Sequence, residues 1–188
     1  HLWSVFPYGS IQYRVGPMMA AADRFEIEIL GQGGHGAQPH LTKDAVVIGS
    51  QLVMNIQQLV SRRVDPIESA VVSVGNFVAQ NAFNVISGRA KLEGTVRTFD
   101  REVRDLIERE LERTVRGTCI SADVDYTFNY LRGYPPVVNY EAETQYLVRV
   151  AETVPGVETV HEMPPLMGGE DFAHYLQHVK GTFFFTGA

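Results

Sequence analysis

The residues with the clearest chemical potential lie between Gly31 and His40, in the run Gly-Gln-Gly-Gly-His-Gly-Ala-Gln-Pro-His. The glycines allow the backbone to approach another group closely or to adopt positive φ. His35, flanked by glycines, is a candidate hydrogen-bond donor or acid–base group, because imidazole can gain or lose a proton near neutral pH. Two other interpretations stay open. Glycine-rich loops between a strand and a helix also bind phosphate, although the nucleotide-binding spacings are absent here, and many are simply turns.

Two further polar residues could contact a ligand. Asn84 lies in a predicted loop between two strands, where the alternative is a turn-forming Asn that hydrogen-bonds its own backbone. Arg97 lies on the polar face of a predicted strand over 89–98. Its guanidinium group suits a substrate carboxylate. The alternative is a cross-strand ion pair with Glu93, which is worth under about 1 kcal/mol if it is exposed.

The other histidines and acidic residues give weaker signals. His1 precedes an apolar pair in a strand and alone indicates little. Glu170 and Asp171 follow two glycines at a predicted helix start, where acidic residues commonly stabilise the helix and a catalytic carboxylate is the less common alternative. No His-Glu-x-x-His pattern is present, so three histidines are expected on the surface: His161, His174 and His178.

The composition limits the class of protein. With 45% hydrophobic and 20% charged residues, the 188-residue chain is typical of a globular protein. A net charge of −6 and the absence of a Lys/Arg cluster argue against nucleic-acid binding. No apolar run is long enough for a membrane span. Cys119 is the single cysteine, which excludes an internal disulfide and fits a reducing, cytoplasmic location.

The apolar periodicity predicts the order β-α-β-β-α-β over residues 20–131. This is the ferredoxin-like arrangement, with two helices covering one face of a four-stranded sheet. We expect Thr42 to cap the first helix, with Asp44 in its first turn, and we expect Asp100 to cap the second helix and Gly117 to end it. The expected strands, in order, are Asp23–Leu30, Ala70–Val78, Arg89–Thr98 and Ala122–Tyr130.

Neither terminal segment contains enough predicted strands to form a sheet of its own. Residues 132–188 contain a predicted helix near Ala142–Glu152, a Pro/Met loop and a final strand. They should therefore pair with residues 1–16, so that 17–131 form an inserted domain. The chain begins without Met and ends in a strand pattern, which suggests an incomplete domain. The expected fold class is α+β.

Seven motifs in order resemble the M20 family, and most closely its amidohydrolase branch of hippurate hydrolases, N-acyl-amino-acid amidohydrolases and auxin-conjugate hydrolases. The resemblance spans the whole chain. The motifs are His1-Leu2-Trp3, Gly16-Pro17-Met18-Met19-Ala20, Gly33-Gly34-His35-Gly36-Ala37-Gln38-Pro39-His40, Asn84-Val85-Ile86, Gly94-Thr95-Val96-Arg97-Thr98-Phe99, Gly133-Tyr134-Pro135-Pro136-Val137-Val138-Asn139 and Met167-Gly168-Gly169-Glu170-Asp171-Phe172.

The resemblance implies a hydrolase with two divalent metal ions, zinc first and Mn, Co or Ni as alternatives, that cleaves N-acyl amino acids with metal-activated water. It implies that unit 17–131 is a dimerisation, or lid, domain inserted in a zinc-peptidase-like catalytic domain. By resemblance, His35 stabilises the oxyanion in the partner subunit's site and His1 is a metal ligand. The implied substrate-binding residues are Asn84, Arg97, Gly168 and Gly169.

The chain also departs from the family pattern. The Cys-Gly-His-Asp segment, the paired glutamates and the last metal-binding His of the family are not in this sequence, and Ser87 stands where the family usually has Pro. One ligand cannot hold two ions. We therefore expect the 188 residues alone to be inactive. A homodimer should form through the strand Ala70–Val78 and the helix Thr42–Arg62. The alternative function is a non-catalytic ferredoxin-like dimerisation or ligand-binding module.

Overall fold

The computed structural model describes all residues from His1 to Ala188, which form two compact units. Unit 1 comprises His1–Ala22 and Tyr134–Ala188, and unit 2 comprises Asp23–Gly133. The sequence placed the two boundaries after residues 16 and 131, whereas the structure has them after residues 22 and 133. The predicted mixed α+β class is confirmed.

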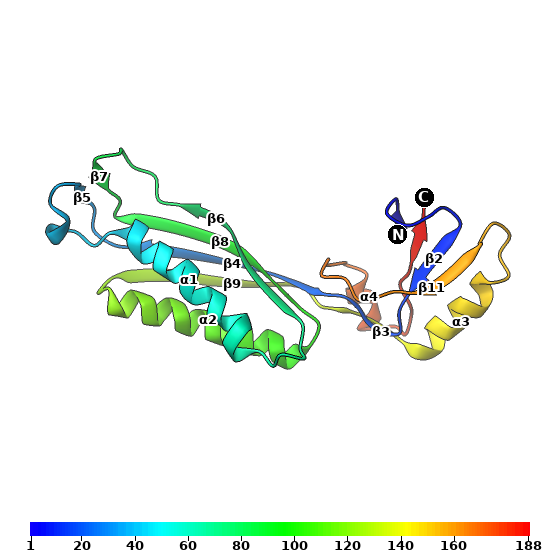
Figure 1. Ribbon diagram of the computed structural model, residues 1–188. Helices are drawn as coiled ribbons and strands as arrows, with labels where there is room; N and C mark the ends of the chain where they lie inside the picture. Colours follow the sequence, from blue (N-terminus) through cyan, green and yellow to red (C-terminus); the bar gives the residue numbers. More distant parts are fainter. The chain divides into compact units, whose positions relative to one another are not determined.

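Unit 2 is a four-stranded sheet with two long helices on one side (Figure 1). The strand order is β6-β8-β4-β9, so β6 and β9 form the two edges. Along the chain the main elements follow the order β4, α1, β6, β8, α2, β9. Their bounds are β4 Ala21–Leu30, α1 Ala45–Arg63, β6 Ala70–Val78, β8 Arg89–Thr98, α2 Arg101–Ser121 and β9 Asp125–Tyr134, with short β5 Gly34–His35, η1 Pro39–Leu41 and β7 Val85–Ile86.

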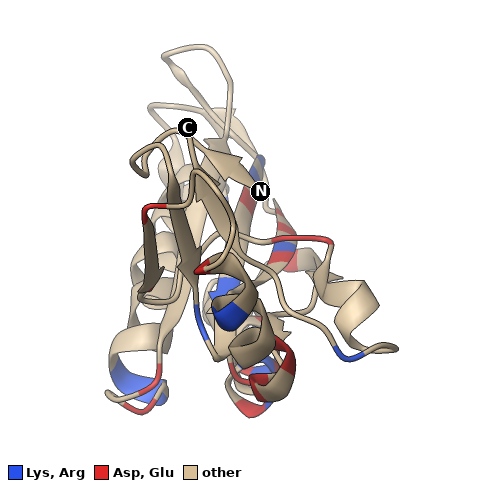
Figure 2. Ribbon diagram, turned by 90° about the vertical axis from the view of Figure 1, so that its right-hand side faces the viewer, with Lys and Arg blue, Asp and Glu red and all other residues tan.

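The core of unit 2 lies between the sheet and its helices. Alternate residues of β4 are buried because successive side chains of a strand point to opposite faces: Phe25, Ile27 and Ile29. Leu52 and Ile56 of α1 are fully buried against them. Figure 2 marks the acidic and basic residues of the chain. α2 carries both signs along its length, whereas the charged residues of α1 are Arg62 and Arg63 at its C-terminal end.

Two predicted helix boundaries are wrong. Asp44, not Thr42, caps α1, because its carboxylate accepts hydrogen bonds from the amides of Val46 and Val47. The Thr42 hydroxyl instead donates to the carbonyl of Pro39. α2 begins after the Asp100 cap as predicted, but it continues through Gly117 to Ser121. The extra turn forms because Thr118 and Cys119 are buried, and this packing outweighs the intrinsic helix-breaking tendency of glycine.

Unit 1 has a sheet with the order β1-β12-β2-β11. β12 pairs in parallel with β1 and antiparallel with β2, so the first and last segments of the chain join as the sequence predicts. The bounds are β1 Leu2–Trp3, β2 Ser10–Tyr13, β3 Gly16–Met19, β10 Val137–Asn139, α3 Glu141–Ala151, β11 Thr159–Glu162, α4 Ala173–Leu176 and β12 Phe185–Gly187.

Asn139 connects three segments of unit 1. Its buried side chain donates to the carbonyls of Arg14 and Phe183 at 2.9 and 2.8 Å, and it accepts from the Phe183 amide at 2.7 Å. Buried backbone groups require such partners. This single amide therefore holds β10 (Val137–Asn139) to the segment before β12.

No helix in the structure has both the length and the apolar character of a membrane span.

Candidate functional site

The loop that carries His35 pairs with the loop that carries Asn84. β5 lies antiparallel to β7, with His35 opposite Val85, and the amide of Gly36 donates to the carbonyl of Asn84 at 2.8 Å. Both His35 and Asn84 are exposed. Two residues that the sequence singled out 49 positions apart are therefore neighbours at one end of unit 2.

The glycines of this loop serve close backbone approach rather than unusual backbone angles. A Cβ at Gly33 would lie 2.7 Å from the carbonyl oxygen of Ile86, and one at Gly36 would lie 2.8 Å from that of Asn84. None of the glycines between residues 31 and 36 has a positive φ. Side chains at these positions would separate the two loops, so the glycines are what places His35 beside Asn84.

The His35 ring has one nitrogen engaged. Its Nδ1 accepts a hydrogen bond from the backbone amide of Ala37 at 3.1 Å. A neutral imidazole carries its proton on one nitrogen only, so an accepting Nδ1 leaves Nε2 as an N–H donor. The exposed imidazole is thus prepared to donate a hydrogen bond without a positive charge.

The neighbouring loop is anchored by Ser87, not by Asn84. The Ser87 hydroxyl is buried, donates to the carbonyl of Arg89 at 2.8 Å and accepts from the Arg89 amide at 3.3 Å. The Asn84 side chain makes no such local bond, whereas the side chain of Asn81 accepts from the Ala82 amide. Asn84 lies in a turn that is closed by the Val85 amide, which donates to the Ala82 carbonyl at 3.0 Å. The Asn84 side chain does not bond its own backbone, so its amide remains open to a ligand.

Arg97 lies far from this loop within the chain. It faces Val71 across the β6–β8 pairing, eight residues along β8 from Arg89. Strands rise about 3.3 Å per residue, so this separation is about 26 Å. The alternative ion pair with Glu93 is wrong, because Arg97 makes no salt bridge while Glu93 is engaged by Arg24 at 2.7 Å. The structure therefore keeps Arg97 apart from His35.

Glu93 provides a prediction about pH. Hydrogen bonds from Asn76, Lys91 and Arg24 lower its pKa to about 2, from an ordinary value of 4.5. A lowered folded-state pKa stabilises the fold above the unfolded value, and this contribution disappears as the pH falls from 4.5 towards 2. We expect Glu93→Gln to lower the urea midpoint at pH 6 more than at pH 2.5, measured by circular dichroism. A pH-independent difference would contradict this linkage.

In unit 1 the structure brings His1 to Glu170. The Nε2 atom of His1 lies 2.6 Å from an Oε2 atom of Glu170, and the His1 ring packs edge-on against Phe183 with centroids 5.3 Å apart. Sequence reasoning treated Glu170 as a helix-start residue and missed this contact. The signal available was its position directly after Gly168 and Gly169.

The two glycines of that loop lie against the residues where β3 leads into β4. The amide of Ala20 donates to the carbonyl of Gly168 at 3.0 Å, and a Cβ at Gly169 would lie 2.6 Å from the Cβ of Ala22. Position 169 therefore admits no side chain. Burial, together with a hydrogen bond from Asp171, raises the pKa of Glu170. The predicted residues of unit 1 thus converge on one small region.

The metal-binding potential of the described chain is limited to this region. No group of three or more His, Cys, Asp or Glu side chains is arranged to hold a metal ion. His1 and Glu170 face each other and are both suitable donors, but zinc sites in proteins commonly use three or four protein ligands. The residues present fit a part of a metal centre and do not complete one.

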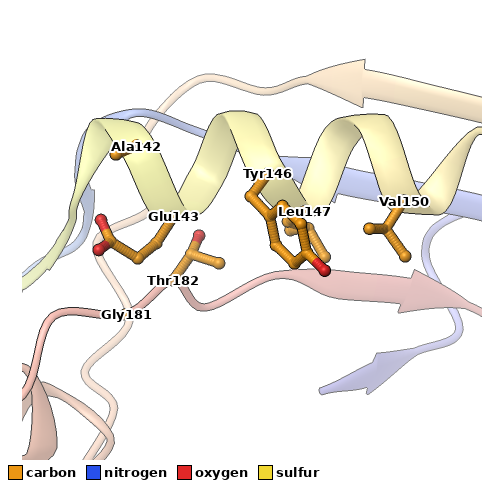
Figure 3. A pocket seen from close by; sticks show the side chains of 7 residues that line it. All are labelled: Ala142, Glu143, Tyr146, Leu147, Val150, Gly181 and Thr182. Atoms are coloured by element: carbon orange, nitrogen blue, oxygen red, sulfur yellow. The ribbon is translucent and has the colours of Figure 1, made fainter.

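Unit 1 also contains an apolar groove of about 470 Å³ between α3 and the segment that follows Val179 (Figure 3). None of the predicted site residues lines it. Its walls are Ala142, Glu143, Tyr146, Leu147, Val150, Gly181 and Thr182.

Comparison with known proteins places this chain in a family. The model of a protein family described as "Peptidase family M20/M25/M40" matches residues 7–188. The protein YhaA of Bacillus subtilis (strain 168), named as an amidohydrolase, is 57% identical over the whole chain, which covers 48% of that protein. An N-acyl-L-amino acid amidohydrolase of Geobacillus stearothermophilus is 50% identical over 141 residues, 75% of this chain and 38% of the relative.

Solved structures with a similar fold support the same family assignment. An aminohydrolase from methicillin-resistant Staphylococcus aureus superposes over the whole chain with a TM-score of 0.88 and 34% identity, covering 48% of that chain. The Bacillus subtilis YxeP protein, described as a dinuclear metal-binding peptidase from the M20 family, has a TM-score of 0.79 and 28% identity over the whole chain and 46% of its own. The chain spans about half the length of these relatives. It belongs to peptidase family M20/M25/M40.

Proposed function

We propose that the full-length protein is a metal-dependent amidohydrolase that cleaves N-acyl amino acids. Similarity to an N-acyl-L-amino acid amidohydrolase and to a dinuclear metal-binding M20 peptidase supports the reaction class and the two divalent ions. The single observation that carries the proposal is the exposed His35 beside Asn84, with its Nε2 left as a neutral donor. Such a donor suits a developing oxyanion, because it is already oriented before charge appears.

The residues of this chain have distinct roles in that reaction. When bound, the metal ions supply an activated water and polarise the amide carbonyl. His1 and Glu170 contribute donors to their site. Arg97, which has no carboxylate partner of its own, binds the substrate carboxylate. The tightly packed backbone at Gly168 and Gly169 lines the substrate pocket. His35 donates to the tetrahedral oxyanion, and Asn84 holds the substrate next to it.

Unit 2 serves as a ferredoxin-like lid that dimerises. Within one chain His35 and Arg97 lie at opposite ends of the β8 strand, too far apart to contact one small substrate. A two-fold axis beside β6 would pair two β6 edges antiparallel, and each molecule's His35 end would then lie beside the other's Arg97 end. The separation within the chain therefore supports catalysis across a subunit interface.

The proposed interface consists of the β6 edge and the side of α1 next to it. Val46 and Val78 are 41% and 46% exposed, and the ring of Phe77 lies against Gly49 of α1. Residues 70–78 have no strand partner on their outer side. An unpaired edge with exposed apolar side chains is normally covered.

The interface is tested by the variant Val46→Glu/Val78→Glu. Both side chains are exposed, so the fold should persist, whereas pairing of the two β6 edges would take the added carboxylates out of water at both ends of the interface. We expect the unchanged protein to sediment as a dimer and the variant as a monomer at micromolar concentration. Val179→Glu, at a 68% exposed position in unit 1, is the control and should remain dimeric. A monomeric unchanged protein would contradict the interface.

We further propose that the 188 residues alone do not catalyse the reaction, because they supply only two facing metal donors. Metal-dependent turnover of hippurate or of N-acetyl amino acids by the 188-residue chain would refute this. The second candidate, a non-catalytic dimerisation or ligand-binding module, rests on the same incomplete donor set. Metal analysis of the full-length protein distinguishes the two, since a non-catalytic module would contain no stoichiometric metal.

A further inference from the structure

The helix α2 carries an unfavourable row of like charges. Arg109, Arg113 and Arg116 follow each other at spacings of four and three residues, which places them on one side of the helix. Neighbouring like charges at these spacings destabilise a helix unless another group compensates them. Glu110 contacts Arg113 at 3.5 Å, and Glu112 lies three residues after Arg109 and four before Arg116. Neither Arg109 nor Arg116 forms a salt bridge. This row is therefore only partly neutralised by the protein itself.

The end of α1 adds two more guanidinium groups. The Asn55 side chain donates to the Thr118 hydroxyl at 3.0 Å, and this bond joins the two helices side by side. About two turns further along α1, Arg62 and Arg63 follow, and the Nε of Arg63 donates to Glu110 at 3.0 Å. Glu110 is buried, so it lies at the base of an arginine cluster.

Two adjacent hollows occur at this cluster. One, of about 290 Å³, lies between the helices and includes Arg62, Arg63 and Arg113. The other, of about 340 Å³, lies along α2 and includes Arg109, Arg113 and Arg116. Both hollows share Arg113 and Glu110. Five arginines thus surround a continuous depression in which the acidic residues are Glu110 and Glu112.

We propose that this depression binds a compact anion with two or more phosphoryl groups. Guanidinium groups bind phosphate oxygens through paired N–H donors, and they keep their charge at any physiological pH. Glu110 occupies only some of the donors of Arg63 and Arg113, and Arg62 donates only through Nη1 to the Ser61 carbonyl at 3.2 Å. The remaining donors of these arginines, with Arg109 and Arg116, are left for a ligand. The ligand would also relieve the like-charge repulsion along α2.

The site is separate from the proposed lid interface. Asn55 and Arg63 are on the side of α1 that faces α2, whereas Gly49 faces the Phe77 ring of β6. The inference therefore does not depend on the proposed amidohydrolase function. An extended nucleic acid is disfavoured because the whole chain has a net charge of −6.

The test is calorimetric titration of the chain with sodium tripolyphosphate and, at equal ionic strength, with sodium sulfate. We expect tripolyphosphate to bind with a Kd at least about tenfold lower than sulfate, because several arginines engage one ligand. Arg62→Ser/Arg113→Ser should raise that Kd by about tenfold or more. Arg101→Ser removes an exposed arginine of α2 outside both hollows and should change the Kd by less than about twofold.

Further titrations show whether the phosphate chain alone or another part of the ligand is recognised. Binding of ATP with an affinity close to that of tripolyphosphate, and none of adenosine, would support recognition of the phosphate chain alone. Equal binding of sulfate and tripolyphosphate, equal loss in the Arg101 variant, or tighter binding of an acidic peptide would overturn the proposal. If the double serine variant does not fold by circular dichroism, Arg62→Lys/Arg113→Lys keeps the charge and should still weaken binding, because lysine lacks the paired donors.

Discussion

Replacing His35 by alanine in the full-length protein is expected to lower kcat by about 10²–10³-fold, the usual effect of removing one oxyanion donor. KM and the unfolding temperature should change little, since the His35 side chain is exposed and its only hydrogen bond is with the Ala37 amide. Steady-state kinetics with an N-acetyl amino acid measure the effect. His40→Ala, in the same loop, is the matched control and should keep full activity. Full activity of His35→Ala would contradict the proposed role.

The geometry of the imidazole permits a sharper version of this experiment. In the structure Nδ1 is an acceptor, so only Nε2 is free to donate. A glutamine amide reaches the position of Nε2 and an asparagine amide reaches that of Nδ1. We therefore expect His35→Gln to retain more activity than His35→Asn. Higher activity of His35→Asn than of His35→Gln would mean that Nδ1, not Nε2, donates the hydrogen bond.

Mixing two inactive variants tests whether the residue acts across the interface. A His1→Ala subunit retains His35, and a His35→Ala subunit retains His1. Random exchange gives half mixed dimers, each with one complete site, so activity should recover to about one quarter of the unchanged protein if catalysis crosses the two-fold axis. No recovery after demonstrated subunit exchange would show that each site uses its own histidine.

The second large effect concerns a buried ion pair in unit 2. Asp23 is fully buried at its side chain and accepts from the Nε of Arg104 at 2.8 Å, with a second guanidinium contact to the same carboxylate. The Tyr130 hydroxyl donates to it at 2.9 Å and the Gly133 amide at 3.0 Å. Burial, with the charge of Asp23, raises the pKa of Tyr130. One carboxylate thus holds together β4, α2 and β9.

We expect Arg104→Ala to lower the free energy of unfolding of unit 2 by about 3–5 kcal/mol, because it leaves the Asp23 charge buried without its partner. Urea unfolding followed by circular dichroism measures the loss. Arg132→Ala removes an exposed bridge to Asp105 and Glu108 and should cost about 1 kcal/mol or less. Asp23→Leu combined with Arg104→Met removes both charges, so it should be less destabilising than Arg104→Ala. Equal losses for Arg104 and Arg132 variants would contradict this view of the pair.

The sequence by itself determined the main helices and strands of unit 2 and the helix α3, but not the short strands β5, β7 and β11, and it placed β9 three to four residues too early. The Val- and Phe-rich composition predicted β6, and alternation of side chains between the two faces predicted β8, both with the bounds that the structure has. The motif order around His35, Asn84 and Gly168–Gly169 indicated the family that the comparisons confirm. Residue types predicted the ends of helices less reliably. Burial of Thr118 and Cys119 extends α2 beyond Gly117, the residue at which the helix was expected to end.

Only the tertiary structure decided which of these residues meet. The contact of His35 with the Asn84 loop depends on backbone pairing between segments far apart in sequence, and so does the contact of His1 with Glu170. The wide separation of Arg97 from His35 likewise follows from strand length and register. Periodicity reports which face of an element is buried, but not which other element lies against it. That depends on long-range packing, which local sequence patterns do not encode.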